Sequence, residues 1–309
     1  MKKKIPFFKT SYDYNEVKAF SKLVRSGNFS MGMATINFEK AIAKKLNITH
    51  ENVALVSNCT TGLHLSMIVT GIKQNHEVLC SSLTFVADAN CIKYVGAKPQ
   101  FVDITSYKNW NMSVNDIKKK IKRNTKAIIM THYAGYPCEI AKIKKIVKQN
   151  KLILIEDACH TIFSKFKKKY LGTYGDLGVF SLYGNKNITT GEGGIVIGKK
   201  EYIKKIKILR NHAINKSMLE RNLSKTPTYQ IEELGYNYRI DDIRSTIGIE
   251  QLKKIDRLNN LRRKVAINYK KMINKELPEI IIPFPNFIGE KYSYHLFPIL
   301  LPPSFDRDK

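Results

Sequence analysis

Near its middle the chain reads Phe180-Ser-Leu-Tyr-Gly-Asn-Lys-Asn-Ile-Thr-Thr-Gly-Glu-Gly-Gly194, an apolar run followed by a lone lysine and a glycine-rich turn. The apolar run predicts a buried strand, and the glycines allow the backbone to approach a neighbouring group closely. A lysine after a strand ordinarily lies at the surface. Between a buried strand and such a turn, however, the amine of Lys186 can be desolvated and can form a Schiff base. Lys186 is therefore the first candidate for a catalytic residue.

Two further segments place polar residues at the ends of predicted strands. Ile153-Leu-Ile-Glu-Asp-Ala-Cys-His160 ends an apolar run on Asp157, at the edge of a parallel sheet where ligands bind. An aspartate that caps the following turn explains that segment equally well. Ser57-Asn-Cys-Thr-Thr-Gly62 leads from a strand into a helix, and its hydroxyls and free N–H groups suit a phosphate. Ordinary N-capping accounts for one of those hydroxyls.

The spacing of apolar residues from Val53 to Val196 alternates short strands with helix-length segments. The predicted strands are 53–57, 77–81, 100–103, 127–131, 152–157, 178–182 and 194–197. The predicted helices between them are 62–71, 86–95, 114–121 and 140–149. This alternation predicts an α/β fold with a mostly parallel sheet flanked by helices on both faces.

The length of 309 residues is enough for about two domains, and the pattern changes near residue 201. Beyond it we predict helices at 202–212, 241–258 and 261–273 and a strand at 294–301. The prediction is a large domain of residues 1–240 and a smaller C-terminal domain of residues 241–309. Because the pattern predicts a helix start at residues 304–309, where the chain stops, we expect this small domain to be truncated.

The net charge of +27 raises the question of a polyanion partner. Of the 53 basic residues, 43 are lysines spread along the whole chain, whereas dedicated nucleic-acid surfaces rely on arginine. We therefore expect no nucleic-acid partner. If the protein is not an enzyme, the alternative is a basic nucleic-acid-binding or regulatory protein.

Cysteine spacing and hydropathy narrow the class of protein further. The five cysteines form no C-x-x-C pair, so neither a metal site nor a disulfide framework is suggested. No apolar run approaches the eighteen residues of a membrane-spanning helix. The prediction is a cytoplasmic protein with no membrane partner.

In their order along the chain, these segments resemble the DegT/DnrJ/StrS family of sugar aminotransferases, which use pyridoxal 5′-phosphate (PLP). The resemblance implies the aspartate-aminotransferase fold, PLP fold type I, and runs from Ile5 to the end of the chain. The motifs that carry it are Ser30-Met-Gly, Asn58-Cys-Thr-Thr-Gly-Leu-His-Leu, Ser82-Leu-Thr-Phe-Val-Ala, Tyr94-Val-Gly-Ala-Lys-Pro, Glu156-Asp, Lys186-Asn-Ile-Thr-Thr-Gly-Glu-Gly-Gly and Leu234-Gly-Tyr-Asn-Tyr-Arg.

The resemblance implies roles around the cofactor ring for four residues. Lys186 would bond to the cofactor aldehyde, and Asp157 would pair with the pyridine nitrogen and raise the pKa of the ring. A protonated ring takes up the electrons released when the substrate Cα loses its proton. Phe85 would stack on the ring face, and His160 would lie near the phenolic oxygen of the ring.

The resemblance also implies how the phosphate would be held. Thr60, Thr61 and Ser181 would bind it within one subunit. Asn237 would reach it from the other subunit, so that a homodimer with shared active sites is implied. Cys59 departs from the family, which often has glycine at that position.

The activity implied is transfer of an amino group from glutamate to a nucleotide-linked keto-sugar, for the synthesis of surface polysaccharides or glycans. Arg239 and His295 are weaker candidates for contacts with the sugar diphosphate. The alternative within the family is a PLP-dependent sugar dehydratase. The family's dehydratases replace the lysine by histidine, so the retained Lys186 favours transamination. Family members generally continue beyond the position of Lys309, so part of the small domain is expected to be missing.

Overall fold

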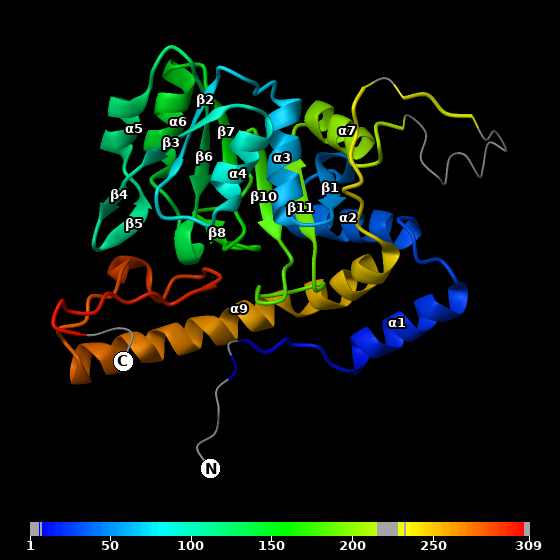
Figure 1. The fold of residues 1–309 in the computed structure, drawn as a ribbon. Coiled ribbons are helices and arrows are strands. Elements are labelled where there is room, and N and C mark those ends of the chain that lie inside the picture. The colour runs from blue at the N-terminus through cyan, green and yellow to red at the C-terminus, as the bar shows by residue number, and fades with distance from the viewer. Residues whose placement is uncertain (1–5, 7, 215–227, 232, 306–309) are drawn as a thin grey trace.

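The computed structural model describes residues 6, 8–214, 228–231 and 233–305, and its centre is a seven-stranded sheet (Figure 1). The strand order is β1-β11-β10-β7-β6-β2-β3. The strands are β1 Val53–Val56, β2 Glu77–Ser81, β3 Lys98–Val102, β6 Thr125–Thr131, β7 Ile153–Asp157, β10 Leu177–Ser181 and β11 Gly194–Gly198. Six of them run parallel to one another, and β11 is antiparallel to both of its neighbours. The predicted α/β fold with a mostly parallel sheet is therefore confirmed.

Two small hairpins and the flanking helices complete the described fold. The hairpins are β4 Ile104–Ser106 with β5 Asn109–Met112, and β8 Lys165–Phe166 with β9 Lys169–Tyr170. The helices are α1 Tyr14–Ser26, α2 Met33–Leu46, α3 Cys59–Val69, α4 Ala87–Tyr94, α5 Val114–Lys120, α6 Ile140–Gln149, α7 Lys200–Leu209 and α9 Asp242–Glu276. Helices α1 and α2 and both hairpins are additional to the elements predicted from the sequence.

The alternation of side chains along each strand divides the core between the two faces of the sheet. In β1, Ala54 and Val56 join a cluster with α3, α4 and α7, whereas Val53 and Leu55 join one with α2 and α9. Toward the other edge, α5 and α6 cover the second face with a third cluster. Because both faces are covered, the strands are apolar along their whole length, as in other buried parallel sheets.

The C-terminal part differs from the sequence-based prediction in two respects. The two predicted helices are one continuous helix, α9, of 35 residues. Asn259, in the gap between the two predicted helices, bonds to the Asn187 side chain (2.7 Å) and to the Ile162 carbonyl (3.1 Å), so its side chain does not compete with the helix backbone. The predicted strand at 294–301 is reduced to a single antiparallel bridge between Ile281 and Leu300.

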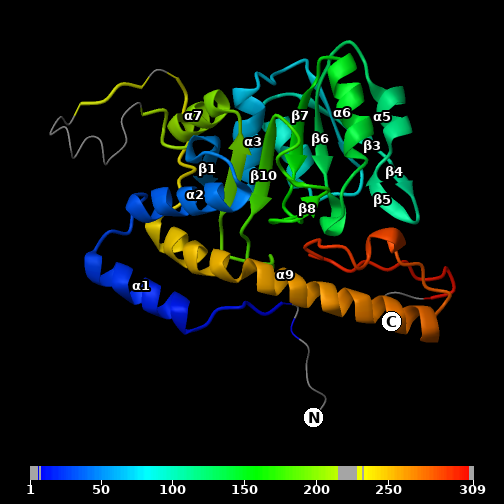
Figure 2. The same cartoon turned by 180° about the vertical axis from the view of Figure 1, so that it is seen from behind.

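Helix α9 joins the two regions that were predicted as separate domains. Its first half packs on α1 and α2, and the segment after it folds back over its second half (Figure 2). The predicted boundary between residues 240 and 241 falls at the cap of this helix and stays a prediction. Residues 306–309, which belong to the predicted helix start, lie outside the described residues.

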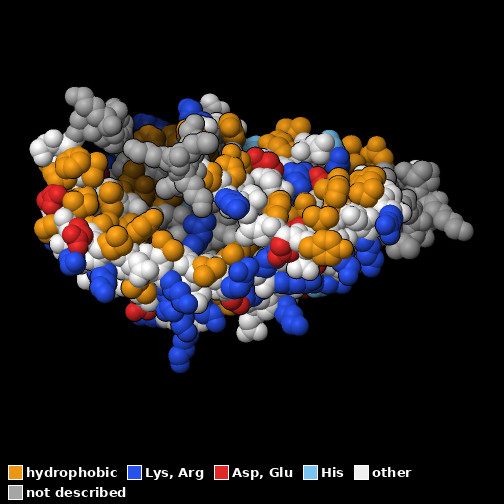
Figure 3. Space-filling model, turned by 90° about the horizontal axis from the view of Figure 1, so that it is seen from below, with side chains coloured by type: hydrophobic (Ala, Val, Ile, Leu, Met, Phe, Trp, Pro, Cys, Tyr) orange, Lys and Arg blue, Asp and Glu red, His pale blue; other side chains and the backbone are white. Residues whose placement is uncertain are grey.

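The face that carries α1 and α9 mixes basic and apolar side chains. Figure 3 shows lysines and arginines scattered among hydrophobic residues on this face. Exposed apolar residues include Val17 and Val24 on α1 and Tyr269 and Met272 on α9. Within the described ranges, no helix has an apolar stretch long enough to cross a bilayer.

We expect Asp242→Ala to lower the free energy of unfolding by roughly 2–3 kcal/mol. The buried Asp242 carboxylate accepts hydrogen bonds from the N–H groups of Gly32, Ala34 and Thr35 and from the Thr35 hydroxyl, at 2.7–3.0 Å. Its loss would leave the N-terminus of α2 without these acceptors. Urea unfolding gives the measurement, with Asp256→Ala as the control. Asp256 is on the same helix but exposed, so the control should lose less than about 1 kcal/mol. Equal losses in the two variants would contradict this function of Asp242.

Candidate active site

A cavity of about 650 Å³ lies at the carboxyl ends of β7 and β10. It is within the size range of small-molecule and cofactor sites. Several segments far apart in the sequence line it, and the residues used below are Thr60, Phe85, Asp157, His160, Ser181, Lys186 and His295. The structure therefore brings together six of the eight residues that the sequence predicted, together with the weaker candidate His295.

Lys186 reaches the cavity from the loop between β10 and β11. Because β11 runs antiparallel to β10, this loop turns back over the same edge of the sheet. The Leu182 N–H donates to the Gly193 carbonyl (2.8 Å), and the Leu182 carbonyl accepts from the Thr190 N–H (3.0 Å). The Lys186 N–H donates to the Tyr183 carbonyl at 2.9 Å. The base of the lysine loop is thus held by backbone hydrogen bonds.

His295 contacts the amine of Lys186, with 3.3 Å between its Nε2 and the Lys186 Nζ. Its Nδ1 lies 3.3 Å from Oδ1 of Asn187, an oxygen that only accepts. Nδ1 therefore carries the hydrogen, and Nε2 accepts from the lysine amine. Burial, together with the neighbouring His160 and Lys186, lowers the pKa of His295 well below its usual value. A neutral imidazole thus holds the end of the lysine side chain.

Asp157 is the last residue of β7 and is 3% exposed. Its Oδ1 accepts a hydrogen bond of 2.9 Å from the N–H of Cys159. The carboxyl group lines the cavity, with Lys186 across it on the following strand–loop unit. An acid at this position can pair with a positively charged group bound in the cavity.

His160 stacks at a tilt on His295, with 4.5 Å between the ring centroids. Its Nδ1 accepts a hydrogen bond from the Ala134 N–H (3.2 Å), so Nε2 carries the ring hydrogen. Burial and the charge of Lys186 lower the pKa of His160 to about 3. His160 is therefore a neutral hydrogen-bond donor over most of the pH range.

The N-terminus of α3 supplies a possible anion site. Asn58 caps this helix by accepting from the Thr61 N–H at 2.9 Å, and Thr60 lines the cavity one residue earlier. The first N–H groups of a helix have no partner within it and attract anions. The Ser181 hydroxyl, at the end of β10, lines the same cavity.

Two of the predicted residues, and the weaker candidate Arg239, do not line the cavity. The Thr61 hydroxyl accepts from the Asn58 N–H at 3.3 Å as part of a capping box, which fits the N-capping alternative. Asn237 is exposed, and its backbone forms an isolated antiparallel β-bridge with Asn211. The Arg239 guanidinium donates to the Asn211 side chain at 2.8 Å. A contact of Asn237 with a second subunit stays a prediction.

Sequence reasoning missed several polar residues that the structure places at the site. Asn187, which fixes His295, lies in the lysine loop but was not singled out. Asn185 also lines the cavity, and its Oδ1 is buried without a hydrogen-bond partner among the described residues. Asp88 is a fully buried carboxyl in α4. The available signal was its position three residues after Phe85 at the start of a helix, but an aspartate there is typical of a helix first turn.

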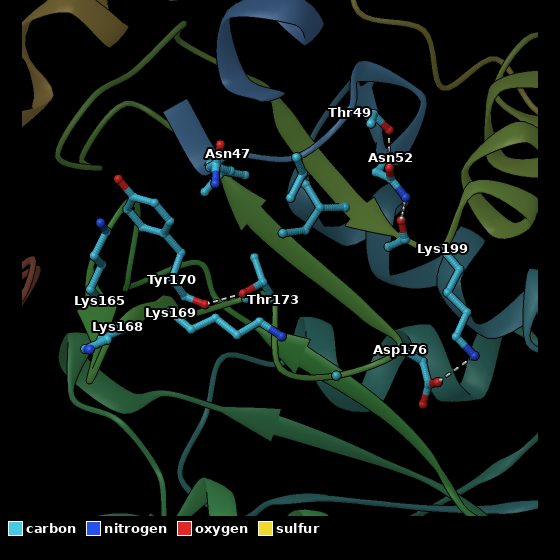
Figure 4. Close-up of a pocket in the computed structure, with 16 residues that line it drawn as sticks. Asn47, Thr49, Asn52, Lys165, Lys168, Lys169, Tyr170, Thr173, Asp176 and Lys199 are labelled. Atoms are coloured by element: carbon cyan, nitrogen blue, oxygen red, sulfur yellow. Dashed lines mark hydrogen bonds and ion pairs between the residues drawn. The ribbon is translucent and has the colours of Figure 1, made fainter. Parts of the chain in front are cut away.

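A second cavity, of about 660 Å³, lies at the opposite end of β10 (Figure 4). It is lined by residues that precede β10 and follow β11, together with the β8–β9 hairpin. Its lysines have partners of their own: Lys199 pairs with Asp176 at 3.5 Å, and Lys165 lies 4.5 Å above the ring of Tyr170. The acid of this cavity, Asp176, is partly exposed and already paired with a lysine, unlike the buried Asp157, so we place the chemistry in the first cavity.

The fold and the lysine-bearing cavity at the carboxyl edge of its sheet define the class of PLP-dependent enzymes with the aspartate-aminotransferase fold. The chain belongs to the DegT/DnrJ/EryC1/StrS aminotransferase family, whose model matches residues 10–309. It is therefore a PLP-dependent aminotransferase.

Relatives with known names support this assignment. The chain is 39% identical to a GDP-perosamine synthase of Escherichia coli O157:H7, over 79% of the chain and 64% of that protein. It is 34% identical to a GDP-perosamine synthase of Vibrio cholerae, over 98% of the chain and 79% of that protein. The solved structure of Helicobacter pylori PseC, an aminotransferase of pseudoaminic acid biosynthesis, is 27% identical with a TM-score of 0.87, over 98% and 79% of the two chains.

The residues present in the cavity fit PLP. The cofactor carries an aldehyde, a ring nitrogen, a phenolic oxygen and a phosphate. The cavity offers an amine, a carboxylate, a neutral imidazole donor and a helix N-terminus with hydroxyls. In addition, the buried Oδ1 of Asn185 has no hydrogen-bond partner among the described residues and is available to a bound group.

We expect His160→Gln to make the free energy of unfolding of the cofactor-free protein depend less on pH in the acid range. Below pH 6.5 an unfolded chain binds a proton at residue 160, but the folded chain binds it only near pH 3. The histidine therefore makes stability fall as the pH falls through this window. Without it, the slope of unfolding free energy against pH should drop by up to about 1.4 kcal/mol per pH unit.

Urea unfolding at several pH values between these limits measures the slope. His50→Gln is the matched control, because His50 is exposed and its loss should leave the slope unchanged. A slope in His160→Gln as steep as in the unmodified protein would show that His160 is charged in the folded state.

Proposed function

We propose that this chain binds PLP through Lys186 and Asp157 and transfers the amino group of glutamate to a nucleotide-linked keto-sugar. The observation that carries the proposal is that the Lys186 amine and the buried Asp157 carboxylate line one cavity at the edge of the sheet. The names of relatives that are 39% and 34% identical support a sugar nucleotide as the substrate. A place in polysaccharide or glycan synthesis and a cytoplasmic location follow from such a substrate.

The bound cofactor would supply an aldehyde that bonds to amines and a ring that accepts electrons. Lys186 is the residue that would hold the cofactor through that aldehyde. With the donor amine bound in the cavity, the Lys186 amine would be free to accept the proton of the substrate Cα and to give it back. His295, which accepts from the Lys186 Nζ, keeps the amine directed into the cavity.

The remaining cavity residues hold and orient the ring. The Asp157 carboxylate would pair with the ring nitrogen and favour its protonated form. The Nε2 hydrogen of His160 is free for the phenolic oxygen, because its Nδ1 is occupied by the Ala134 N–H. Phe85, which is 69% exposed and lines the cavity, would cover one face of the ring and lose much of that exposure.

The phosphate would lie at the N-terminus of α3, held by Thr60, Ser181 and the free N–H groups of the first turn. The Thr61 hydroxyl would support this site by fixing the turn, through its bond to the Asn58 carbonyl. Asn237 of the partner subunit would complete it in a homodimer. The exposure of Asn237 in one chain supports this arrangement.

We expect Lys186→Ala to abolish covalent attachment of PLP. After incubation with PLP, treatment with borohydride and denaturation, the unmodified chain should keep the mass of one cofactor, and the variant should keep none. Lys199→Ala is the matched control, since Lys199 lines the second cavity at the other end of the sheet and should not affect attachment. Attachment to Lys186→Ala in full yield would contradict the assignment.

We expect glutamate and a nucleotide-linked keto-sugar to yield an amino-sugar nucleotide together with 2-oxoglutarate. Lys186 is needed for the return of the proton in transamination, and its retention argues against dehydration at C3. Mass spectrometry of GDP-linked and UDP-linked keto-sugars distinguishes an aminated product from a deoxy product. A deoxy product with no amination would replace the proposed reaction by dehydration.

A further inference from the structure

A second buried carboxyl group lies beside the cavity and has no role in the function proposed above. Asp88 is in the first turn of α4, and its side chain is fully buried. Its Oδ2 accepts hydrogen bonds from the hydroxyls of Thr84 and Thr131, both at 2.6 Å. Its Oδ1 is buried and has no hydrogen-bond donor among the described residues.

The neighbour of Asp88 is the carboxyl group of Asp157. Thr131, which donates to Asp88, is paired with Asp157 across strands β6 and β7. Burial, followed by the charge of Asp157, raises the pKa of Asp88 well above its usual value. Two adjacent carboxyl groups in a buried site cannot both be ionised without a large cost, so the pair shares a proton.

The surroundings indicate which of the two carries the proton. Asp157 lines the cavity and already accepts from the Cys159 N–H, so it is the hydrogen-bond acceptor of the pair. Asp88 faces the thiols of Cys80 and Cys91, which burial keeps neutral: the pKa of Cys80 is raised to about 12, and that of Cys91 is raised as well. Neither thiol offers a positive charge that would favour an ionised Asp88.

We propose that Asp88 is protonated and donates a hydrogen bond from its Oδ1 to the carboxylate of Asp157. Asp88 is then a positioning residue that acts on the cofactor through Asp157, and this part of the inference rests on the proposed function. The two threonine hydroxyls fix the Asp88 side chain, and the Asp88 hydroxyl in turn fixes the orientation of Asp157 toward the cavity. The pair carries a single negative charge, which matches the single positive charge of a protonated ring nitrogen.

The state of the proton is tested on the cofactor-free chain by infrared spectroscopy. At neutral pH the unmodified protein should show the carbonyl stretching band of a buried protonated carboxylic acid. The band should be lost in Asp88→Asn. In Asp157→Asn it should remain but shift, because the acceptor of the hydrogen bond has changed. Absence of the band from the unmodified protein, or its loss in Asp157→Asn alone, would overturn the proposal.

The positioning role is tested by two substitutions and PLP binding. Asp88→Asn keeps the shape, accepts from the threonines and donates an amide N–H to Asp157, so it should stay within about threefold of the unmodified affinity. Asp88→Ala removes that donor and should weaken PLP binding by roughly tenfold or more. It should also shift the pH dependence of the absorbance of bound PLP, which a purely structural residue would leave unchanged. An Asn variant as impaired as the Ala variant would contradict the proposal.

The two experiments separate this inference from the proposed function. If the unmodified chain failed to bind PLP, the proposed function would fall while the infrared result still decided the protonation of Asp88. If PLP bound covalently to Lys186 but no protonated acid were found, only the inference about Asp88 would fall.

Discussion

The Lys186 amine and the Asp157 carboxylate must face the same cavity, and the sheet is built so that they do. Asp157 ends β7, and the adjacent parallel strand β10 leads into the lysine loop, so both groups leave the sheet at one edge. The antiparallel strand β11 returns that loop to the sheet and holds its base by backbone hydrogen bonds. The apolar clusters on both faces, and the helices that contribute to them, make this edge rigid enough to keep an amine and an acid apart but within reach of one ligand.

The polar side chains around Lys186 and Asp157 can form hydrogen bonds without adding charge to the cavity. His160 and His295 are held neutral by burial, each with one ring nitrogen fixed by a neighbour. In our proposal Asp88 is neutral as well, for the same reason of burial next to a charge. Neutral donors and acceptors can orient a bound group without competing for the carboxylate of Asp157. Such a shell is expected where a cofactor must be bound in one orientation.

The fold was largely predictable from the sequence, because buried parallel strands read as short apolar runs between helices. All seven strands of the sheet were placed within about two residues of their observed bounds. The two helices predicted at 241–258 and 261–273 are one helix, and Asn259 within it has tertiary partners in Asn187 and Ile162 that no local pattern reveals. Six of the eight predicted site residues line the cavity, but Asp88 was missed, since its significance depends on a neighbour 69 positions away. The contact of Asn237 with a partner subunit cannot be seen in one chain.

The most direct measurement is a crystal structure of the chain with PLP bound. We predict continuous density from the Lys186 Nζ to the cofactor, the ring nitrogen within about 3.2 Å of an Asp157 oxygen, and the phosphate at the first turn of α3. A cofactor joined to another lysine, or bound with its ring nitrogen facing away from Asp157, would contradict the arrangement on which the function rests.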